Sequence, residues 1–378
     1  MENKIVIIGG GFAGLNAVRA LRRLDQHLPI TVIDHREHAH FLPLLPDVIG
    51  RGIKPETLLM SHRYLAEKLK VQFIYDKVTS IDFEKKSASL GAGTVSYDYL
   101  MVTSGAETNF YSQKSVEPYC CCLETVQDAR KIKEAAQKDE VETIVIVGGG
   151  YTGIEIATNL RRLLQQKQLF KRIVIIERAS SILGPLPQWM KDYAKRNLLQ
   201  LNIQVKLETT LQDAKEGKIT LSNHEIIDRS LLIWVAGVKT GSFIQNLNAE
   251  KNPQGRIKVD KYLRCSEHCF VAGDAACVSH LDSPVRMAVQ FSIMEGIVAA
   301  NNIFRSIKKK PLREYQPVDL GYVIPMANNR SCGWVLGLNL RGLLPTILHY
   351  VMCFYRLYGL RNRFYLVKDL VRGLAKKP

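Results

Sequence analysis

The sequence lacks several features that would place a protein in a specialised class. It has no low-complexity tract, and its start runs straight into an apolar stretch without the charged and long apolar regions of a signal peptide. Its eight cysteines do not form the paired framework of a small secreted domain. We therefore expect a globular protein from a reducing compartment, and 378 residues are enough for two or three domains.

The formal net charge of +16 indicates a basic surface. Such a surface is often only solvated, but it can also face an anionic membrane, nucleic acid or acidic cofactors. The sequence contains neither a zinc knuckle nor an RNP signature. We therefore expect no nucleic-acid partner, and we expect no metal site.

A glycine-rich segment near the N-terminus follows a predicted strand. Residues 4–8 form a short apolar run, which is typical of a strand buried in a parallel sheet. Residues 9–14 then read Gly-Gly-Gly-Phe-Ala-Gly and fit the pattern G-x-G-x-x-G. A helix is predicted over Leu15–Leu24 and a second strand over Ile30–Ile33, which Asp34 follows. This order of strand, glycines, helix, strand and acid predicts a dinucleotide site.

Each position in this pattern has a physical role. Gly9 allows a tight turn, Gly11 lets a pyrophosphate approach the backbone, and Gly14 lets the helix pack closely on the strand. Asp34 lies 20 residues after Gly14, where a carboxylate accepts hydrogen bonds from ribose hydroxyls. A glycine-rich turn that binds no ligand is the alternative.

The same pattern returns in the middle of the chain. Residues 143–147 predict a buried strand, residues 148–153 read Gly-Gly-Gly-Tyr-Thr-Gly, and residues 154–164 predict a helix. Another strand is predicted over residues 171–176, and Glu177 ends it. Two fingerprints imply two dinucleotides, and a hydride relay from a nicotinamide to a flavin is the simplest chemistry that needs both.

Glu177 also bears on the choice of nicotinamide cofactor. A carboxylate at this strand end suits the free 2′-hydroxyl of NADH and repels the 2′-phosphate of NADPH. Arg178 follows it and acts in the opposite direction. We expect NADH to be preferred.

Three further segments suggest how the domains are connected. Residues 97–106 read as a strand that leads into a turn of small residues, residues 231–237 as another strand, and residues 270–276 as a strand that ends in Gly-Asp. Flavin enzymes with two dinucleotide domains commonly carry such segments, and the carboxylate of Asp274 can hold the ribityl hydroxyls of FAD. The predicted domains are an FAD-binding domain of residues 1–111 and 238–325, an NAD(H)-binding domain of residues 112–237, and a C-terminal segment of residues 326–378.

The sequence resembles the type II NADH:quinone oxidoreductases, which are single-subunit flavoproteins of the membrane surface. The resemblance covers essentially the whole chain and includes His40–Pro46, Gly148–Glu155, Trp234–Gly237, Gly273-Asp274 and Tyr358–Arg363. It implies an α/β fold with two Rossmann-like domains, as in glutathione reductase, and a helical membrane-binding segment at the C-terminus. It also implies non-covalent FAD, oxidation of NADH by hydride transfer to the flavin, delivery of electrons to quinone without proton pumping, and a possible homodimer.

The resemblance assigns residues to both cofactors. Those expected to bind FAD are Gly9, Gly11, Phe12, Ala13, Gly14, Asp34, His35, Pro43, Val78, Ser104, Gly105, Gly273, Asp274 and Ala288. Those expected to bind NAD(H) are Gly148, Gly150, Tyr151, Thr152, Gly153, Glu155, Glu177, Ala236 and Gly237. Glu155 matches a family carboxylate near the flavin and the nicotinamide, and it is also predicted to be catalytic. Its alternative role is that of a salt-bridged helix residue.

The predicted quinone side departs from the family pattern. The family carries Ala-Gln-x-x-x-Gln after a proline, whereas here Arg286 stands at the first glutamine position and Gln290 keeps the second. Both are predicted to be catalytic, because either can donate a hydrogen bond to a quinone carbonyl and a cation can stabilise an anionic reduced flavin. Arg286 can instead be a surface residue that forms an ion pair, and the departure leaves the acceptor less certain than the donor.

The cysteines separate this chain from disulfide-using relatives. Residues 35–60 contain no cysteine, which argues against the C-x-x-x-x-C chemistry of disulfide reductases. In a sulfide:quinone oxidoreductase, Cys120, Cys121 or Cys122 would have to meet Cys332, but the intact NAD fingerprint favours a structural role for all of them. An NADH reductase of a soluble acceptor and an apoptosis-factor-like scaffold also fit parts of the sequence.

The C-terminal tail is basic and partly apolar. Residues 341–378 carry eight basic residues and one acid, a net charge of +7. A spanning helix over Leu343–Leu360 is disfavoured, because Pro345, His349 and Arg356 interrupt it. From Phe364 onward, an amphipathic helix is predicted with Leu366, Val367, Leu370, Val371 and Leu374 on one face and Arg363, Lys368 and Arg372 on the other. We expect it to lie on an anionic leaflet at the cytoplasmic face of the cell membrane; docking on the protein body or a dimer contact is the alternative.

Overall fold

The computed structural model describes residues 3–279 and 285–375. The chain forms two compact units, each assembled from three segments. Unit 1 consists of Met1–Ala39, Met60–Glu107 and Lys239–Asp319, and unit 2 consists of His40–Leu59, Thr108–Val238 and Leu320–Pro378. The chain passes between the units through paired strands, namely β3 (His38–His40) with β4 (Leu59–Ser61) and β10 (Ala106–Thr108) with β19 (Val238–Thr240).

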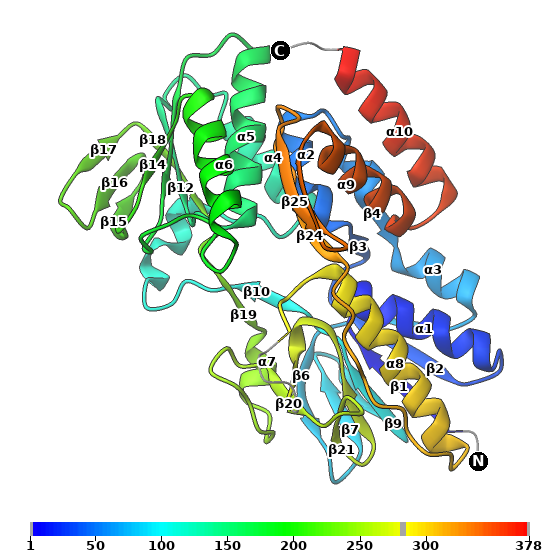
Figure 1. The fold of residues 1–378 in the computed structure, drawn as a ribbon. Helices are drawn as coiled ribbons and strands as arrows, with labels where there is room; N and C mark the ends of the chain where they lie inside the picture. Colours follow the sequence, from blue (N-terminus) through cyan, green and yellow to red (C-terminus); the bar gives the residue numbers. More distant parts are fainter. Residues whose placement is uncertain (1–2, 280–284, 376–378) are drawn as a thin grey trace. The chain divides into compact units, whose positions relative to one another are not determined.

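Unit 1 is built on a six-stranded sheet with the order β21-β22-β9-β1-β2-β5 (Figure 1). Its strands are β1 (Ile5–Ile8), β2 (Ile30–Asp34), β5 (Gln72–Tyr75), β9 (Tyr99–Val102), β21 (Arg264–Ser266) and β22 (Cys269–Val271). All are parallel except β21, which pairs antiparallel with β22 at the edge. Parallel strands end on the same edge, so the loops after β1, β9 and β22 lie together.

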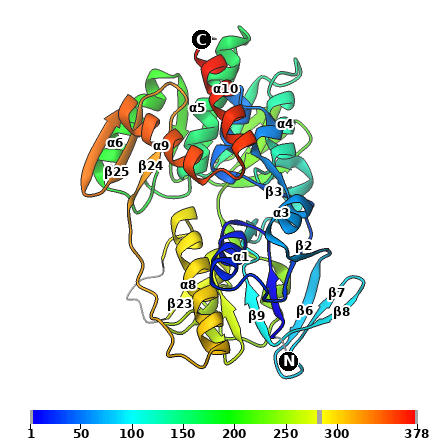
Figure 2. The same ribbon diagram turned by 90° about the vertical axis from the view of Figure 1, so that its right-hand side faces the viewer.

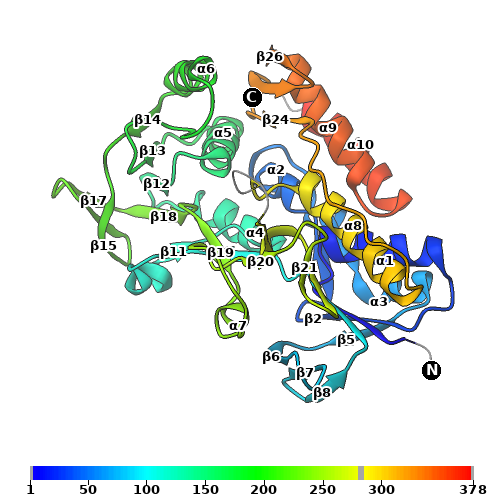
Figure 3. The same cartoon turned by 60° about the horizontal axis from the view of Figure 1, so that its bottom comes forward.

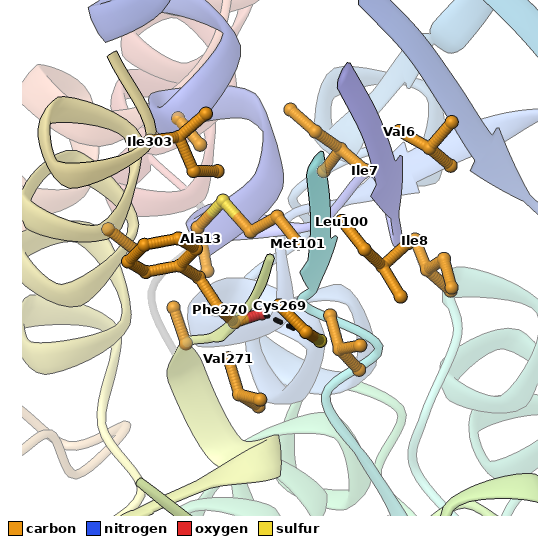
Figure 4. Packing of buried hydrophobic residues seen from close by; sticks show 14 of the residues in the cluster. Val6, Ile7, Ile8, Ala13, Leu100, Met101, Cys269, Phe270, Val271 and Ile303 are labelled. Carbon is orange, nitrogen blue, oxygen red and sulfur yellow. Dashed lines mark hydrogen bonds between the residues drawn. The ribbon is translucent and has the colours of Figure 1, made fainter. Parts of the chain in front are cut away.

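The centre of this sheet is buried because its strands are continuously apolar. All four residues of β1 are buried, as are Leu100, Met101 and Val271 on the neighbouring strands. Figure 4 shows part of this buried cluster, to which Ile303 of α8 (Val289–Ile307) also belongs. The predicted strand over residues 4–8 is therefore found, with its first residue outside the observed bounds.

Two helices of unit 1 pack along each other beside the sheet. They are α1 (Phe12–Leu24) and α8, which lie side by side in Figures 1 and 2. They approach closely at Gly296, where an added Cβ would lie 2.3 Å from the carbonyl oxygen of Ala13. The remaining elements of this unit are α3 (His62–Leu69), β6 (Val78–Asp82), β7 (Ser87–Leu90), β8 (Gly93–Ser96), α7 (Ser242–Gln245), β20 (Ile257–Val259) and β23 (Ala276–Val278).

Unit 2 contains a five-stranded parallel sheet with the order β11-β18-β12-β13-β14 (Figure 3). Its strands are β11 (Cys120–Cys121), β12 (Thr143–Val147), β13 (Arg172–Ile176), β14 (Ile203–Lys206) and β18 (Ser230–Trp234). The helices of its central part are α4 (Val126–Ala135), α5 (Tyr151–Gln166) and α6 (Gln188–Gln200), and β15 (Leu211–Lys215), β16 (Lys218–Leu221) and β17 (Ile226–Asp228) form an antiparallel sheet. The order of β12, α5 and β13 repeats that of β1, α1 and β2 in unit 1, as the sequence predicted.

Both helices after the glycines begin three residues earlier than predicted. They start at Phe12 and Tyr151 rather than at Leu15 and Ile154. Each first turn contains the last glycine of the fingerprint, Gly14 or Gly153, although glycine is a poor helix former. The structure includes it in the first turn because its lack of a side chain is needed there for packing.

Residues 40–59 belong to unit 2 by their contacts, whereas the prediction placed them in the FAD-binding domain. The reason is the packing of α2 (Leu45–Gly50) against α5 and α4. An added Cβ at Gly50 would lie 2.1 Å from the carbonyl oxygen of Asn159, so α2 and α5 touch backbone to backbone. Sequence order alone gave no sign of this exchange of segments. The assignment of each cofactor to a domain stays a prediction.

The C-terminal segment of unit 2 folds into a small sheet and two helices. The strands β24 (Gly321–Ile324), β25 (Ser331–Val335) and β26 (Leu338–Gly342) are antiparallel, and α9 (Leu343–Arg356) and α10 (Leu360–Ala375) follow. Figure 3 shows α9 and α10 running beside each other. Within the described residues, no helix is both long and apolar enough to cross a bilayer.

Candidate functional site

The first glycine fingerprint has the backbone geometry that its spacing predicted. Gly9 has a φ of +104°, and an added Cβ there would lie 2.4 Å from the carbonyl oxygen of Thr103. An added Cβ at Gly14 would lie 2.0 Å from the carbonyl oxygen of Gly9, so the first turn of α1 packs directly on the loop. Gly11 differs from both, because its φ is −78° and nothing lies within 4 Å of an added Cβ.

The second fingerprint repeats these features in unit 2. Gly148 has a φ of +114°, and its added Cβ would lie 2.8 Å from the carbonyl oxygen of Val235. An added Cβ at Gly153 would lie 2.0 Å from the carbonyl oxygen of Gly148. Gly150, like Gly11, has an ordinary φ of −79° and open space at its Cβ position.

Gly11 and Gly150 are therefore not explained by the fold itself. Each is the N-cap of a helix, and neither helix has a side chain that caps its first N–H groups. Such a helix end attracts an anion, through its exposed N–H groups and its dipole. Open space in front of each glycine suits a pyrophosphate, so both loops fit the dinucleotides that the sequence predicted.

The two predicted acids occupy equivalent positions. The carboxylate of Asp34 accepts hydrogen bonds from the backbone N–H of Gly10 at 2.7 Å and of Arg36 at 2.8 Å. The carboxylate of Glu177 accepts from the N–H of Gly149 at 2.7 Å and of Ala179 at 2.9 Å. A carboxylate has about four acceptor sites, so each acid is held in orientation by the loop and can still accept from ribose hydroxyls.

We expect Glu177→Gln to lower the preference for NADH over NADPH about tenfold, because it removes the charge that repels a 2′-phosphate. The glutamine oxygen can still accept from the N–H of Gly149, so the loop should keep its shape. Steady-state kcat/KM for both cofactors measures the preference. Glu208→Gln is the matched control. Glu208 is exposed, and its backbone N–H donates a hydrogen bond to the carbonyl oxygen of Ala179. An unchanged ratio in Glu177→Gln would contradict the assigned role.

Other residues of unit 1 gather around the first fingerprint. The Thr103 hydroxyl donates to the carbonyl oxygens of Ile8 and Gly9 at the carboxyl ends of β1 and β9. The hydroxyl of Ser104, the next residue, is buried and has no hydrogen-bond partner among the described residues. Gly105 has a φ of +69° and open space at its Cβ position. A polar ligand could bind the unsatisfied Ser104 hydroxyl and occupy the open space at Gly11 and Gly105.

The loop after β22 brings Asp274 to the same edge of the sheet, near the buried Glu295 of α8. The Glu295 carboxylate accepts from the backbone N–H of Gly273 at 2.7 Å. Burial raises the pKa of Glu295 to about 7 and also raises that of Asp274, while Arg256 opposes both shifts. Glu295 was not predicted, because it lies within the apolar stretch of α8 and belongs to no sequence motif.

The remaining residues predicted for FAD are more scattered. Phe12 and Ala13 begin α1, Ala288 is the N-cap of α8, and Val78 is buried in β6. His35 is exposed, and its Nδ1 lies 3.6 Å from the Asp34 carboxylate. Pro43 lies in unit 2, in the short 3-10 helix Leu42–Leu44. His62 was missed, although its ring contacts the backbone carbonyl oxygens of both Gly10 and Arg36.

In unit 2, two tyrosines flank the residues predicted for NAD(H). The Tyr111 hydroxyl donates to the carbonyl oxygen of Ala236, and an added Cβ at Gly237 would lie 2.3 Å from that hydroxyl. The rings of Tyr151 and Tyr322 meet edge to face, with centroids 6.2 Å apart. Thr152 lies beside Tyr151 in the first turn of α5. Neither Tyr111 nor Tyr322 was predicted, because each comes from a segment without a motif.

Arg286 and Gln290 share one partner. Arg286 donates to a carboxylate oxygen of Asp319 at 2.7 Å, and the buried Gln290 amide donates to the same oxygen at 3.0 Å. The ion pair is the alternative that the sequence left open for Arg286. Asp319 was not predicted, and it joins the two residues of the altered motif. Pro284, which begins that motif, lies outside the described residues.

Glu155 lies in a buried group of charges in unit 2. It lines a small pocket together with Asp47 and Arg51, and its carboxyl forms no ion pair or hydrogen bond with any described residue. Asp47 lies 3.3 Å from the guanidinium of Arg51 and accepts a hydrogen bond from the Tyr350 hydroxyl at 2.9 Å. Burial raises the pKa of both carboxyl groups, and the charge of Asp47 raises that of Glu155 further. The salt-bridged alternative for Glu155 is therefore not what the structure shows.

The eight cysteines are all free thiols in the structure. Cys332 is fully buried in β25, and burial raises its pKa to about 12. A hydrogen bond with Cys122, and next burial, raise the pKa of Cys120, and burial raises that of Cys121. The hydrogen bond with Cys120 lowers the pKa of Cys122. Thiols with raised pKa values are poor nucleophiles. Between residues 3 and 375, leaving out 280–284, no cluster of His, Cys, Asp or Glu is arranged to hold a metal ion.

Comparison with known proteins supports the predicted fold and the stated resemblance. The chain is 27% identical to demethylphylloquinone reductase NdbB of Synechocystis sp. over 93% of this chain and 92% of that protein. It is 26% identical to the type II NADH:quinone oxidoreductase of Staphylococcus saprophyticus over 90% and 92%, respectively. Its fold matches NDH2 from Plasmodium falciparum in complex with NADH, with a TM-score of 0.87, 18% identity and 98% coverage of both chains.

These matches confirm the α/β fold with two Rossmann-like units. A family model matches far more of the chain than the two fingerprints, from the start of unit 1 to a point inside α8. It covers residues 3–301 and identifies the chain as a member of the pyridine nucleotide-disulphide oxidoreductase family.

Proposed function

We propose that this protein oxidises NADH and transfers the electrons through FAD to a membrane quinone. The observation that carries the proposal is the pair of loops at Gly11 and Gly150, each open at the helix end and each backed by an oriented acid. Relatives named as NADH:quinone and demethylphylloquinone reductases support the acceptor class. The unpaired, largely high-pKa thiols give no support to sulfide oxidation.

The two cofactors would be held by equivalent residues. In unit 1, the N–H groups at the start of α1 bind the pyrophosphate of FAD, Asp34 binds a ribose, and Ser104 and Asp274 offer polar groups near the same edge. In unit 2, the start of α5 binds the pyrophosphate of NADH and Glu177 binds its ribose hydroxyls. When bound, FAD supplies the means of taking two electrons from NADH and passing them to a quinone.

The protein's own residues contribute orientation and protons. Quinone reduction takes up two electrons and two protons, whereas the hydride of NADH carries two electrons and only one proton, so the second proton must come from the solvent. Burial, and next the charge of Asp47, raise the pKa of Glu155 and so favour its protonated form. We assign it the role of proton donor to the acceptor side. Gln290 and Arg286 orient the acceptor, with Asp319 fixing both donors.

The outer surface of α9 and α10 suits a membrane. We define the apolar face as the exposed hydrophobic residues of these helices: Leu343, Leu344, Ile347, Val351, Met352, Phe354, Tyr355, Leu360, Phe364, Tyr365, Val367 and Val371. Arg361, Lys368 and Arg372 are exposed on α10 beside it. Such a combination favours the interface of an anionic leaflet. We propose that this face binds the cytoplasmic side of the cell membrane peripherally, where a lipid-soluble quinone is available.

We expect the double variant Tyr355→Asp/Phe364→Asp to bind anionic vesicles at least about tenfold more weakly, because each aromatic contributes more than about 1.4 kcal/mol when it is buried in lipid. Their exposed fractions are 74% and 66%. Co-sedimentation with vesicles of phosphatidylglycerol and phosphatidylcholine measures the affinity. Phe170→Asp is the control, since Phe170 is 99% exposed on unit 2 but lies outside the apolar face. Equal loss in both variants would contradict the assignment.

One anaerobic experiment tests the whole reaction. Purified protein is mixed with NADH, and the flavin absorbance is followed in a stopped-flow instrument. A short-chain quinone is then added in a second mix. Rapid bleaching by NADH followed by rapid recovery with quinone is the expected result. A flavin that NADH does not bleach would refute the proposal, and bleaching by sulfide in its place would favour a sulfide:quinone oxidoreductase.

A further inference from the structure

A cavity of about 600 Å³ lies between α9 and α10 in unit 2. Its lining combines apolar side chains of the two helices with several polar side chains. It is lined by Arg51, Arg162, Asn329, Leu343, Thr346, Ile347, Tyr350, Val351, Phe354, Leu366, Val367, Leu370 and Gly373. Several of these residues also belong to the apolar face, so the cavity opens among the residues proposed to meet the membrane.

The charge of the lining is positive. Of the described residues around this cavity, two are arginines and none is acidic. The one acid of α10, Asp369, is buried elsewhere and accepts hydrogen bonds from the Lys54 N–H and the Thr57 hydroxyl. The lining therefore combines apolar side chains with two cationic groups, and one of these, Arg51, also lies 3.3 Å from the buried Asp47 outside the lining.

The two arginines are held in place by the protein. The Arg51 guanidinium donates to the carbonyl oxygen of Met326 and the side-chain oxygen of Asn329, and it lies over the Tyr350 ring. Arg162 donates to the carbonyl oxygen of Gly373. Burial lowers the pKa of Arg162, and the charge of Arg51 lowers it further. The two cations therefore repel each other, while Asp47, 3.3 Å from the Arg51 guanidinium, and Tyr350 oppose that effect on Arg162. An anion in the cavity would oppose the repulsion further.

We propose that this cavity binds one long-chain fatty acid, with its chain between α9 and α10 and its carboxylate at Arg51 and Arg162. A guanidinium is well suited to a carboxylate, because its planar set of N–H donors matches the two oxygens. A cavity of this volume holds a single small ligand, which favours one acyl chain over the two chains of a phospholipid. The site goes beyond the proposed function, because neither dinucleotide loop contributes to it.

The test compares two ligands with the same chain and different heads. Full-length protein with its flavin is equilibrated with a dansyl-labelled fatty acid, and palmitate or palmityl alcohol is used to displace it. We expect palmitate to bind about tenfold more tightly than the alcohol, as one charge-assisted contact predicts. Arg162→Gln should remove most of that difference, and Ile347→Trp should abolish binding of both ligands by filling the cavity.

Two checks separate this result from misfolding and from the proposed function. Val371→Trp is the matched control, since Val371 is exposed on α10 but does not line the cavity. Every variant should keep its melting temperature, its flavin content and its rate of bleaching by NADH. Equal binding of acid and alcohol to the unmodified protein would show a site for neutral chains and would overturn the proposal. Unchanged binding in Ile347→Trp would also overturn it.

Discussion

Replacing Gly150 with alanine is expected to weaken NADH binding at least about 100-fold while leaving the fold intact, a loss of about 2.8 kcal/mol. The backbone at Gly150 has a φ of −79°, which alanine adopts freely, and nothing in the protein lies within 4 Å of the added Cβ. The methyl group therefore meets no protein atom. It meets the pyrophosphate, if that group occupies the open space at the start of α5.

The measurement is the Kd for NADH, together with the melting temperature and the flavin content. Gly11→Ala is the equivalent change in unit 1, and it should lower the flavin content while the melting temperature of flavin-free protein stays the same. Gly153→Ala provides the contrast, because its Cβ would lie 2.0 Å from the carbonyl oxygen of Gly148 and should destabilise the unit. Normal NADH binding by Gly150→Ala would show that the space in front of α5 is not the nucleotide site.

The fingerprints could be predicted because they are local. Each one places a turn, a helix start and a strand end within about 35 residues, and each glycine has a separate steric reason. Buried strands such as 143–147 were also evident from their continuous apolar runs. The sequence therefore predicted both dinucleotide loops, the acids at Asp34 and Glu177, and the α/β fold that the family match confirms.

The sequence predicted Glu155 but not the residues that surround its carboxyl group. Its neighbour Asp47 comes from a segment that precedes the second fingerprint by about a hundred residues, and the Tyr350 hydroxyl that binds Asp47 lies 303 positions away from it. No periodicity links residues so far apart. Their meeting depends on α2 packing against α5, which the expected domain boundaries did not include.

The tail was predicted in part. An amphipathic helix from Phe364 onward is present within α10, but its apolar residues do not share one exposed face. Leu366 is fully buried, whereas Val367 and Val371 are exposed. Asp369 draws the helix onto the protein body through its hydrogen bonds to Lys54 and Thr57. A helical repeat shows which residues share a side, but it does not show which side the body covers.

Glu155→Gln is expected to lower the rate of quinone reduction about 100-fold, because a positioned proton donor commonly contributes that much. Glutamine has nearly the shape of a protonated glutamate and is always neutral, so the fold and NADH binding should be kept. Stopped-flow measurement separates bleaching by NADH from recovery with quinone, and only the recovery should slow. Equal recovery rates for both proteins would remove Glu155 from the proton-donor role.

The pH dependence gives a second and independent test of this residue. Burial and Asp47 raise the pKa of Glu155, so its proton is present below the raised pKa and is lost as the pH rises through it. The rate of quinone reduction should therefore fall on the alkaline side, and Glu155→Gln should remove that fall. Asp47→Asn should move the fall to lower pH, because it removes a negative charge that favours the protonated form and leaves Arg51 to favour the ionised one. A shift to higher pH in Asp47→Asn, with melting temperature and flavin content retained, would mean that Asp47 does not act on Glu155 through its charge.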